Sequence, residues 1–276
     1  MKLSLCNEVL QPMPFAQQCA WAAAAGYDAL ELAPFTLADD PQTLTPAGAS
    51  AFKAIAADHG LLISSLHWLL VKPDGLSMVT TDAAVRRQTL VFLRQLMDFA
   101  AACGATALVH GSPKQRSPLP GQTVADAIGR LTDALAELAP HALAAGVTYC
   151  IEPLSPVETP VINTVAEAAA LVDRIGSPAL RTMLDVSAAS QAETEPVHAV
   201  LARYLASGHI AHVQFNDRNR RGPGQGDTAQ APVLQVLRDA GYTGWMAVEP
   251  FDYQPDGPAC AAFSAGYLRG LWSQLS

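Results

Sequence analysis

Three acidic residues of the chain each end a short apolar run. Glu152 ends Cys-Ile-Glu, Asp185 ends Met-Leu-Asp, and Glu249 ends Ala-Val-Glu. A carboxylate in such a place is costly to bury unless it is paired, hydrogen-bonded or bound to a metal ion. Gln214 holds a similar position in His-Val-Gln-Phe. If the fold brings them together, these four oxygen-bearing side chains could surround one divalent cation.

A site of this composition has a definite chemistry. Hard oxygen ligands favour Mn²⁺, with Mg²⁺ and Co²⁺ as alternatives. A divalent cation there would stabilise the enediolate that forms when a base removes a proton from a carbon beside a carbonyl group. Without a cation, three crowded carboxylates would repel one another and drive one pKa upward. The alternative interpretation is that the acids pair with arginines such as Arg181, or lie solvated at a rim.

A repeated pattern indicates how such residues would be positioned. An alanine-rich helical segment, a glycine and a short apolar run recur at Gly26, Gly60, Gly104, Gly146, Gly176, Gly208 and Gly241. A glycine directly after a helix is the usual left-handed cap, so each one marks a helix end and a strand start. With Lys2–Asn7 as the first strand, the pattern predicts eight strands that alternate with helices.

Continuous apolar strands alternating with helices are typical of a parallel sheet covered by helices. The further predicted strands are Ala29–Leu32, Leu62–Trp68, Thr106–His110, Thr148–Leu154, Leu180–Asp185, Ile210–Phe215 and Trp245–Pro250. Eight such units over this length predict an α/β fold, the (β/α)₈ TIM barrel, as a single domain over residues 1–276. A doubly wound open sheet is the alternative, but no glycine-rich turn follows the first strand.

In a barrel, the carboxyl ends of the strands converge on one face, where active sites lie. The four residues named above would end strands five to eight. Further polar or aromatic side chains are expected to contact a substrate there: His67, Trp68, His110, Glu158, Asn216 and Arg220. Packing inside the barrel is the alternative role for the two histidines, and a solvated loop or a dimer contact is the alternative for Arg220.

The motifs resemble the sugar phosphate isomerase/epimerase family, which has the xylose isomerase-like TIM barrel. That family includes D-tagatose and D-psicose 3-epimerases, inosose dehydratase and endonuclease IV. The resemblance rests on Ile151-Glu152-Pro153-Leu154, Leu184-Asp185, His212-Val213-Gln214-Phe215-Asn216-Asp217 and Val248-Glu249-Pro250-Phe251. It implies that Glu152, Asp185, Gln214 and Glu249 are metal ligands, and that the two glutamates form an acid/base pair.

Two positions differ from the pattern of the 3-epimerases and endonuclease IV. Gln214 and Ala188 stand where those proteins have histidines. The prediction is a divalent-metal-dependent sugar isomerase or epimerase that acts on a ketose or keto-sugar through an enediolate. One alternative is a lyase or dehydratase of a keto-sugar or keto-inositol that uses the same metal site and the same proton abstraction. The other is a non-catalytic barrel that binds a sugar.

The composition limits the partners of the chain. Its 276 residues are 50% hydrophobic, which excludes disorder, and its 17 Lys and Arg against 25 Asp and Glu argue against nucleic-acid binding. No apolar stretch is long enough to span a membrane. The five scattered cysteines are typical of reduced thiols in a cytoplasmic protein. A small sugar is therefore the expected partner, and apolar side chains in the loops are compatible with a homodimer.

Overall fold

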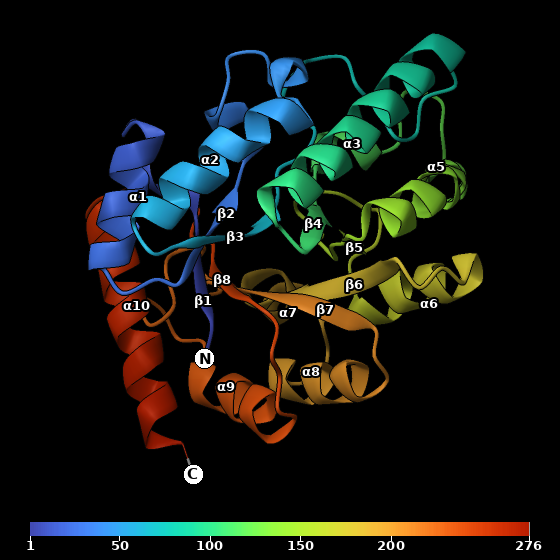
Figure 1. The fold of residues 1–276 in the computed structure, drawn as a ribbon. Coiled ribbons are helices and arrows are strands. Elements are labelled where there is room, and N and C mark those ends of the chain that lie inside the picture. Colours follow the sequence, from blue (N-terminus) through green and yellow to red (C-terminus); the bar gives the residue numbers. More distant parts are fainter. Residues whose placement is uncertain (276) are drawn as a thin grey trace.

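Eight parallel strands pair in chain order in the computed structural model, and the eighth pairs with the first (Figure 1). The structure describes residues 1–275. The strands are β1 (Leu3–Cys6), β2 (Ala29–Leu32), β3 (Leu62–Leu66), β4 (Ala107–His110), β5 (Thr148–Ile151), β6 (Leu180–Asp185), β7 (Ile210–Phe215) and β8 (Met246–Val248). This closed barrel confirms the predicted fold class.

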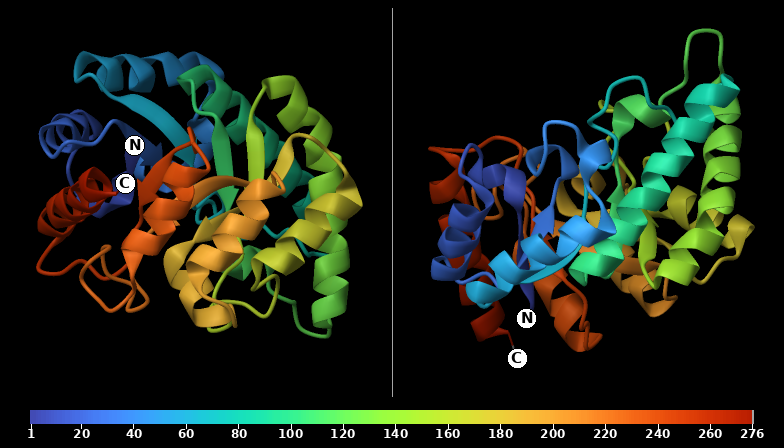
Figure 2. Two further views of the ribbon diagram at one scale, coloured as in Figure 1. Left: turned by 90° about the horizontal axis from the view of Figure 1, so that it is seen from below. Right: turned by 45° about the horizontal axis from the view of Figure 1, so that its top comes forward.

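Helices follow the strands and surround the barrel (Figure 2). The α-helices are α1 (Phe15–Ala24), α2 (Pro46–Asp58), α3 (Ala83–Cys103), α4 (Pro113–Arg116), α5 (Val124–Ala145), α6 (Val165–Ile175), α7 (Val186–Ala192), α8 (Val197–Ala206), α9 (Gln230–Asp239) and α10 (Gly257–Gln274). Short 3₁₀ turns are η1 (Asn7–Leu10), η2 (Pro34–Thr36) and η3 (Pro41–Thr43). Within residues 1–275, no helix is long and apolar enough to cross a membrane.

The helix ends follow from local sequence. All seven glycines of the repeated pattern have positive φ. Gly104 (φ 86°) and Gly146 (φ 72°) cap α3 and α5, where a side chain would strain the left-handed backbone. At the other end, Thr164 and Glu167 form a reciprocal capping box that begins α6. These caps place the following strands in register around the barrel.

Buried apolar side chains form one large cluster and one small cluster. Leu108 of β4 belongs to the large cluster between strands and helices. Its neighbours Ala107 and Val109 belong to a small cluster that also contains Cys150 and Met183. Because successive strand residues face opposite sides, the small cluster fills the inside of the barrel beneath the ends of β4, β5 and β6.

Candidate active site

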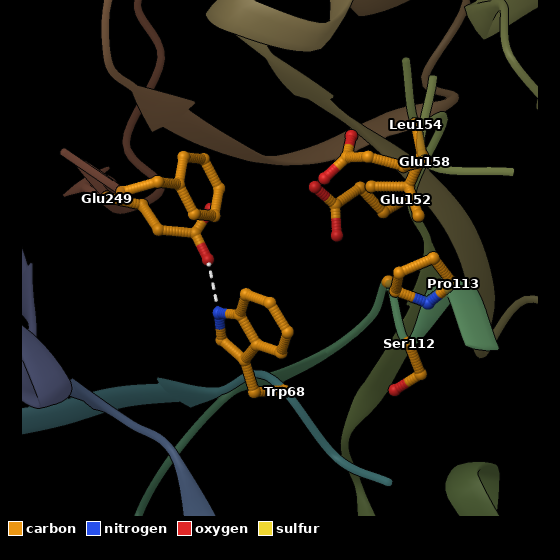
Figure 3. A pocket seen from close by; sticks show the side chains of 9 residues that line it. Trp68, Ser112, Pro113, Glu152, Leu154, Glu158 and Glu249 are labelled. Atoms are coloured by element: carbon orange, nitrogen blue, oxygen red, sulfur yellow. Dashed lines mark hydrogen bonds between the residues drawn. The ribbon is translucent and has the colours of Figure 1, made fainter. Parts of the chain in front are cut away.

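A cavity of about 290 Å³ lies at the carboxyl ends of the strands (Figure 3). The residues that line it follow β3, β4, β5 and β8: Trp68, Gly111, Ser112, Pro113, Glu152, Leu154, Glu158, Glu249 and Phe251. Figure 3 shows Glu249 on one side of the cavity and Glu152 with Glu158 on the other. This is the face of the barrel at which the sequence places the strand-end residues.

Glu152, Asp185 and Glu249 lie together at this face. Each offers a carboxylate oxygen, and these three atoms lie within 4.8 Å of one another. Asp185 is the last residue of β6, while Glu152 and Glu249 directly follow β5 and β8. Their side chains are buried, with 6%, 3% and 3% exposed for Glu152, Asp185 and Glu249. Three negative carboxylates at this spacing repel one another, so they require either protonation or a bound cation.

Asp185 is held in place by backbone and amide groups. Its Oδ1 accepts a hydrogen bond from the Ala188 backbone N–H at 2.7 Å, and its Oδ2 accepts one from Asn216 Nδ2 at 2.6 Å. Asn216 also donates to the Glu249 carbonyl at 3.1 Å and accepts from the Ser187 N–H at 2.6 Å. The side chain of Asn216, predicted to contact substrate, is thus occupied by the protein and positions Asp185.

Glu249 is held by two aromatic residues. Its Oε1 accepts a hydrogen bond from Trp68 Nε1 at 3.0 Å and lies 2.9 Å from His67 Nδ1. The other ring nitrogen of His67 lies 2.9 Å from Glu8 Oε2. Both nitrogens of His67, another predicted substrate contact, are therefore engaged by carboxylates. Glu249 Oε2 is buried and has no hydrogen-bond partner among residues 1–275.

Gln214 stands opposite Asp185 in the pairing of β6 with β7. Its Nε2 donates a hydrogen bond to Glu31 Oε1 at 2.8 Å, and its Oε1 is buried without a partner in the described part of the chain. Glu31 Oε2 in turn accepts from Ser65 Oγ at 2.7 Å and lies 2.6 Å from His212 Nε2. The amide oxygen of Gln214 is thus left available to bind a cation. Glu31, which orients this amide, is a residue to which the sequence alone assigns no role.

The carboxylates near the cavity differ from Glu31 in their electrostatics. Burial raises the pKa of Asp185 to about 7 and that of Glu249 to about 8. Burial, followed by repulsion from these two groups, raises the pKa of Glu152 well above its ordinary value. Burial alone would also raise the pKa of Glu31, but attraction and hydrogen bonding to His212 lower it to about 2. Glu152, Asp185 and Glu249 therefore lack a positive partner for their carboxylates, whereas Glu31 has His212 beside it.

Glu152 is held through its backbone. Arg116 is fully buried and donates hydrogen bonds from Nη1 to the carbonyls of Glu152 at 2.6 Å and His110 at 3.3 Å. No group of residues 1–275 forms a hydrogen bond with the Glu152 carboxylate. Instead the carboxylate lies against Gly111, where an added Cβ would be only 2.4 Å from Oε2. The lack of a side chain at residue 111 leaves room for it.

The remaining predicted substrate contacts divide into two groups. Trp68 and Glu158 line the cavity, and Arg220 lines an adjoining chamber of about 230 Å³ beside Asp185. Arg220 Nη1 lies 3.5 Å from Glu158 Oε1. His110 is fully buried, bonds to the Tyr149 hydroxyl at 2.7 Å, and is not among the residues that line the cavity. It shares a strand face with Leu108 and points away from the inside of the barrel.

The donor atoms fit a hard divalent cation. The three clustered carboxylates offer only oxygen ligands, and Glu249 Oε2 has no hydrogen-bond partner in the described part of the chain. Gln214, on the strand beside Asp185, has an unpartnered amide oxygen of the same kind. A second group, Cys6, Glu8, His67 and Glu249, is also closely spaced. There the His67 nitrogens are engaged, and burial raises the pKa of the Cys6 thiol well above its ordinary value, which disfavours a thiolate ligand.

Residues 19–271 match the family described as the xylose isomerase-like TIM barrel. The chain belongs to this family. The probable ketose 3-epimerase of Synechocystis sp. is 26% identical over 66% of this chain and 63% of its own length, so the chain matches less than two thirds of that relative. The fructoselysine 3-epimerase of Escherichia coli O157:H7 is 28% identical over 87% of this chain and 86% of its own length.

Solved structures share the family fold. A crystal structure of D-psicose 3-epimerase in the presence of D-fructose superposes with a TM-score of 0.83 at 21% identity and covers 99% of both chains. A 3-keto-D-glucoside 4-epimerase from E. coli superposes with a TM-score of 0.83 at 19% identity, covering 98% of this chain and 99% of the other. At such identities the likeness concerns the fold.

Proposed function

We propose that this chain is an enzyme, a divalent-metal-dependent epimerase or isomerase of ketoses or keto-sugars. The observation that carries the proposal is the placement of Glu152 and Glu249 on opposite sides of one small cavity, with Asp185 within 4.8 Å of both (Figure 3). The names of the relatives, a ketose 3-epimerase and a fructoselysine 3-epimerase, support a sugar substrate.

Glu152, Asp185, Gln214 and Glu249 would hold the cation. Their oxygen-only character favours Mn²⁺, with Mg²⁺ or Co²⁺ as alternatives. When bound, such an ion neutralises the negative charge that develops on substrate oxygens during proton abstraction. It also supplies the counter-charge that the raised pKa values of Asp185 and Glu249 indicate is missing.

The two glutamates have the chemistry of an acid/base pair. One carboxylate would take the proton from the carbon beside the carbonyl, and the other would return a proton to the opposite face, which inverts that centre. Hydrogen bonds from Trp68 and His67 fix Glu249 Oε1, so its unpartnered Oε2 is the atom available for proton transfer or ion binding. Burial in the cavity wall makes both carboxylates more basic than a free glutamate.

The walls of the cavity would orient the sugar. Trp68 and Phe251 form one apolar side, with their rings in edge contact at 6.2 Å between centroids. Glu158, with Arg220 beside it, offers charged groups to substrate hydroxyls. Trp68 thus joins the apolar wall to the acid/base machinery, because its N–H bonds to Glu249.

Hydrogen exchange in D₂O tests the proposal directly. The enzyme, loaded with Mn²⁺ or stripped with EDTA, is incubated with D-fructose, D-tagatose and D-psicose, and products are followed by NMR. We expect deuterium at the carbon beside the carbonyl of the product, and only in the presence of a divalent ion. Exchange in the stripped enzyme, or no exchange with any ketose or keto-sugar, contradicts the proposal.

The same experiment separates the alternatives. An unsaturated product that absorbs in the ultraviolet, formed from a keto-sugar or keto-inositol, would instead indicate a lyase or dehydratase. Sugar binding without turnover in the presence of each metal would indicate a non-catalytic barrel. A Glu195→Gln variant serves as the control, because Glu195 lies at the surface, paired with Arg203.

The cellular setting is also part of the proposal. The five cysteines are free and buried, which supports a cytoplasmic enzyme with reduced thiols. A homodimer stays a prediction, and the exposed Val157 in the loop after β5 is a candidate contact for it. Size-exclusion chromatography with light scattering on the wild type and on Val157→Ser tests the dimer.

A further inference from the structure

A second hollow of about 630 Å³ lies immediately outside the cavity. Its lining consists of Glu8, Phe35, Trp68, Val71, Arg220, Phe251 and Tyr253, and we call it the vestibule. Trp68 and Phe251 line both the cavity and the vestibule, and Arg220 lines both the vestibule and the chamber beside Asp185. A ligand in the cavity could therefore extend directly into the vestibule.

The sizes of the two spaces indicate different occupants. The cavity is the smaller of the two, with about 290 Å³ of empty space including its opening, and it holds the carboxylates, so the carbonyl end of a ketose belongs there. The vestibule has more than twice that volume and lies beyond the reacting groups. A free ketose would leave it filled only with water.

The vestibule wall is held in a fixed shape. Trp68 has a left-handed backbone (φ 51°), and its indole N–H is bonded to Glu249. Arg220 also has a left-handed backbone (φ 69°), and its carbonyl accepts hydrogen bonds from the N–H groups of Phe251 and Asp252 at 2.8 and 2.9 Å. The Arg220 guanidinium lies over the Phe251 ring, 4.5 Å from its centroid. This wall is therefore ordered before any ligand arrives.

The lining has the chemistry of a carbohydrate subsite. Phe35, Phe251 and Tyr253 present aromatic surface, against which the apolar C–H face of a sugar ring can pack. Glu8 keeps one carboxylate oxygen beyond the one that faces His67, and Arg220 adds donors, so hydroxyl groups at the edge of a ring would find partners of both kinds. An extended apolar group would leave these charges unsatisfied.

We propose that the vestibule is a second sugar subsite, and that the preferred substrate is a ketose bearing another sugar ring at the end remote from its carbonyl. This inference rests on the proposed function, because proton abstraction requires the carbonyl end of the ketose to lie among the carboxylates. The second ring must then be attached to the carbon at the other end of the ketose chain, so that it can extend into the vestibule. A 6-O-glucosyl ketose such as isomaltulose has this form.

Steady-state kinetics on D-fructose and isomaltulose with the Mn²⁺-loaded enzyme test the proposal. We expect kcat/KM to be about tenfold higher for isomaltulose, and Phe35→Ala to remove this advantage by raising KM while leaving kcat and the D-fructose reaction unchanged. Phe35→Leu should retain part of the advantage. Phe263→Ala removes an exposed aromatic ring from α10, outside the vestibule, and should change neither reaction.

Each outcome bears on one proposal. Equal efficiency for the two sugars, or equal losses on both in Phe35→Ala, would overturn the second subsite and leave the proposed function standing. Preference for a ketose carrying an amino acid, such as fructoselysine, over isomaltulose would also overturn it. Turnover of neither sugar would overturn the second subsite, and only the absence of exchange with every ketose or keto-sugar would defeat the proposed function itself. Binding of isomaltulose by saturation-transfer NMR to the Glu249→Gln variant with Mg²⁺, which is diamagnetic and for which glutamine keeps an oxygen ligand, supports the subsite without any turnover when both rings show contacts.

Discussion

The inside of the barrel has two unlike halves beneath its mouth. Below Glu249 lies a polar network in which Glu31 contacts Gln214, Ser65 and His212. Below Glu152 lies the small apolar cluster of Ala107, Val109, Cys150 and Met183. The two glutamates that face each other across one cavity are thus supported in different ways.

This difference separates two means of positioning a carboxylate. The Glu249 carboxylate is oriented by hydrogen bonds from Trp68 and His67, and His67 is oriented in turn by Glu8. Glu152 is fixed through its backbone, because Arg116 donates to its carbonyl and its N–H donates to the His110 carbonyl, while its carboxylate rests against the backbone of Gly111. The Glu249 side is therefore pre-organised, whereas the Glu152 side depends on a cation or substrate to hold its carboxylate.

Replacing each glutamate by glutamine gives the largest expected effect. Glu152→Gln and Glu249→Gln should each lower kcat/KM by about 10³-fold, because each removes one member of the acid/base pair. The stability of the metal-free variants should differ. Glu249→Gln weakens the hydrogen bonds that Glu249 Oε1 makes with Trp68 and His67, and it should lower the free energy of unfolding by about 1 kcal/mol at pH 5.5, where a carboxyl group with a pKa of about 8 is already uncharged. Glu152→Gln should leave it unchanged or raise it.

Urea denaturation in EDTA and steady-state kinetics measure the two effects, with Glu195→Gln as the surface control. Equal destabilisation by the two substitutions would show that the two carboxylates are supported alike. Wild-type turnover in either variant would remove that glutamate from the proposed pair.

Glu31→Gln tests the polar half. Glutamine preserves the size of the side chain but removes the negative charge beside His212, 2.6 Å away. We expect the free energy of unfolding to fall by about 3 kcal/mol, because the buried His212 ring loses the carboxylate beside it. Ser65→Ala, which removes one hydrogen bond to the same carboxylate, should cost only about 1 kcal/mol. If chemical denaturation showed the two variants to be equally stable, the Glu31 carboxylate would not be the main partner of His212.

Much of this arrangement can be predicted from sequence. Each strand start after the first is marked by a helix-capping glycine, and positions such as Glu152, Asp185 and Glu249 end the apolar runs that follow. The barrel fold is confirmed, and these three side chains do lie together. The pattern works because capping and strand burial are local effects that short segments record.

Two features of the site could not be predicted from sequence. One is the face of the strand on which a side chain lies, and the other is the set of contacts that form only when the barrel closes. His110 lies at a strand end like Glu152, but it occupies the outer face with Leu108, and its alternation with Val109 is the only sequence feature that indicates this. The contact of Glu31 with Gln214 joins residues 183 positions apart. No local pattern encodes such a contact, although Glu31 ends an apolar run as the other acids do.

Gly111→Ala tests the Glu152 half with a single methyl group. The added Cβ would lie 2.4 Å from Glu152 Oε2, so the end of the flexible side chain must move. We expect kcat/KM to fall by about 10²-fold with little change in stability, because displacement by about 1 Å is enough to misplace a reacting group. Gly129→Ala in α5, where nothing lies within 4 Å of the new Cβ, is the matched control and should keep full activity. Full activity in Gly111→Ala would mean that Glu152 tolerates displacement.

The smallest expected effect is the pH dependence of thermal stability in the metal-free enzyme. The folded-state pKa values of Asp185, about 7, and Glu249, about 8, lie above the ordinary values of about 4. The folded chain therefore binds more protons than the unfolded chain between pH 4 and 8, and its stability falls as pH rises through this window. Metal binding requires ionised carboxylates, so the rise in Tm on adding Mn²⁺ should be larger at pH 8 than at pH 5.5, by about 4 °C. In Asp185→Asn the pH dependence should weaken, because one titrating acid is gone. A Mn²⁺-induced shift that is the same at both pH values would mean that these carboxylates are not the ones that bind the ion.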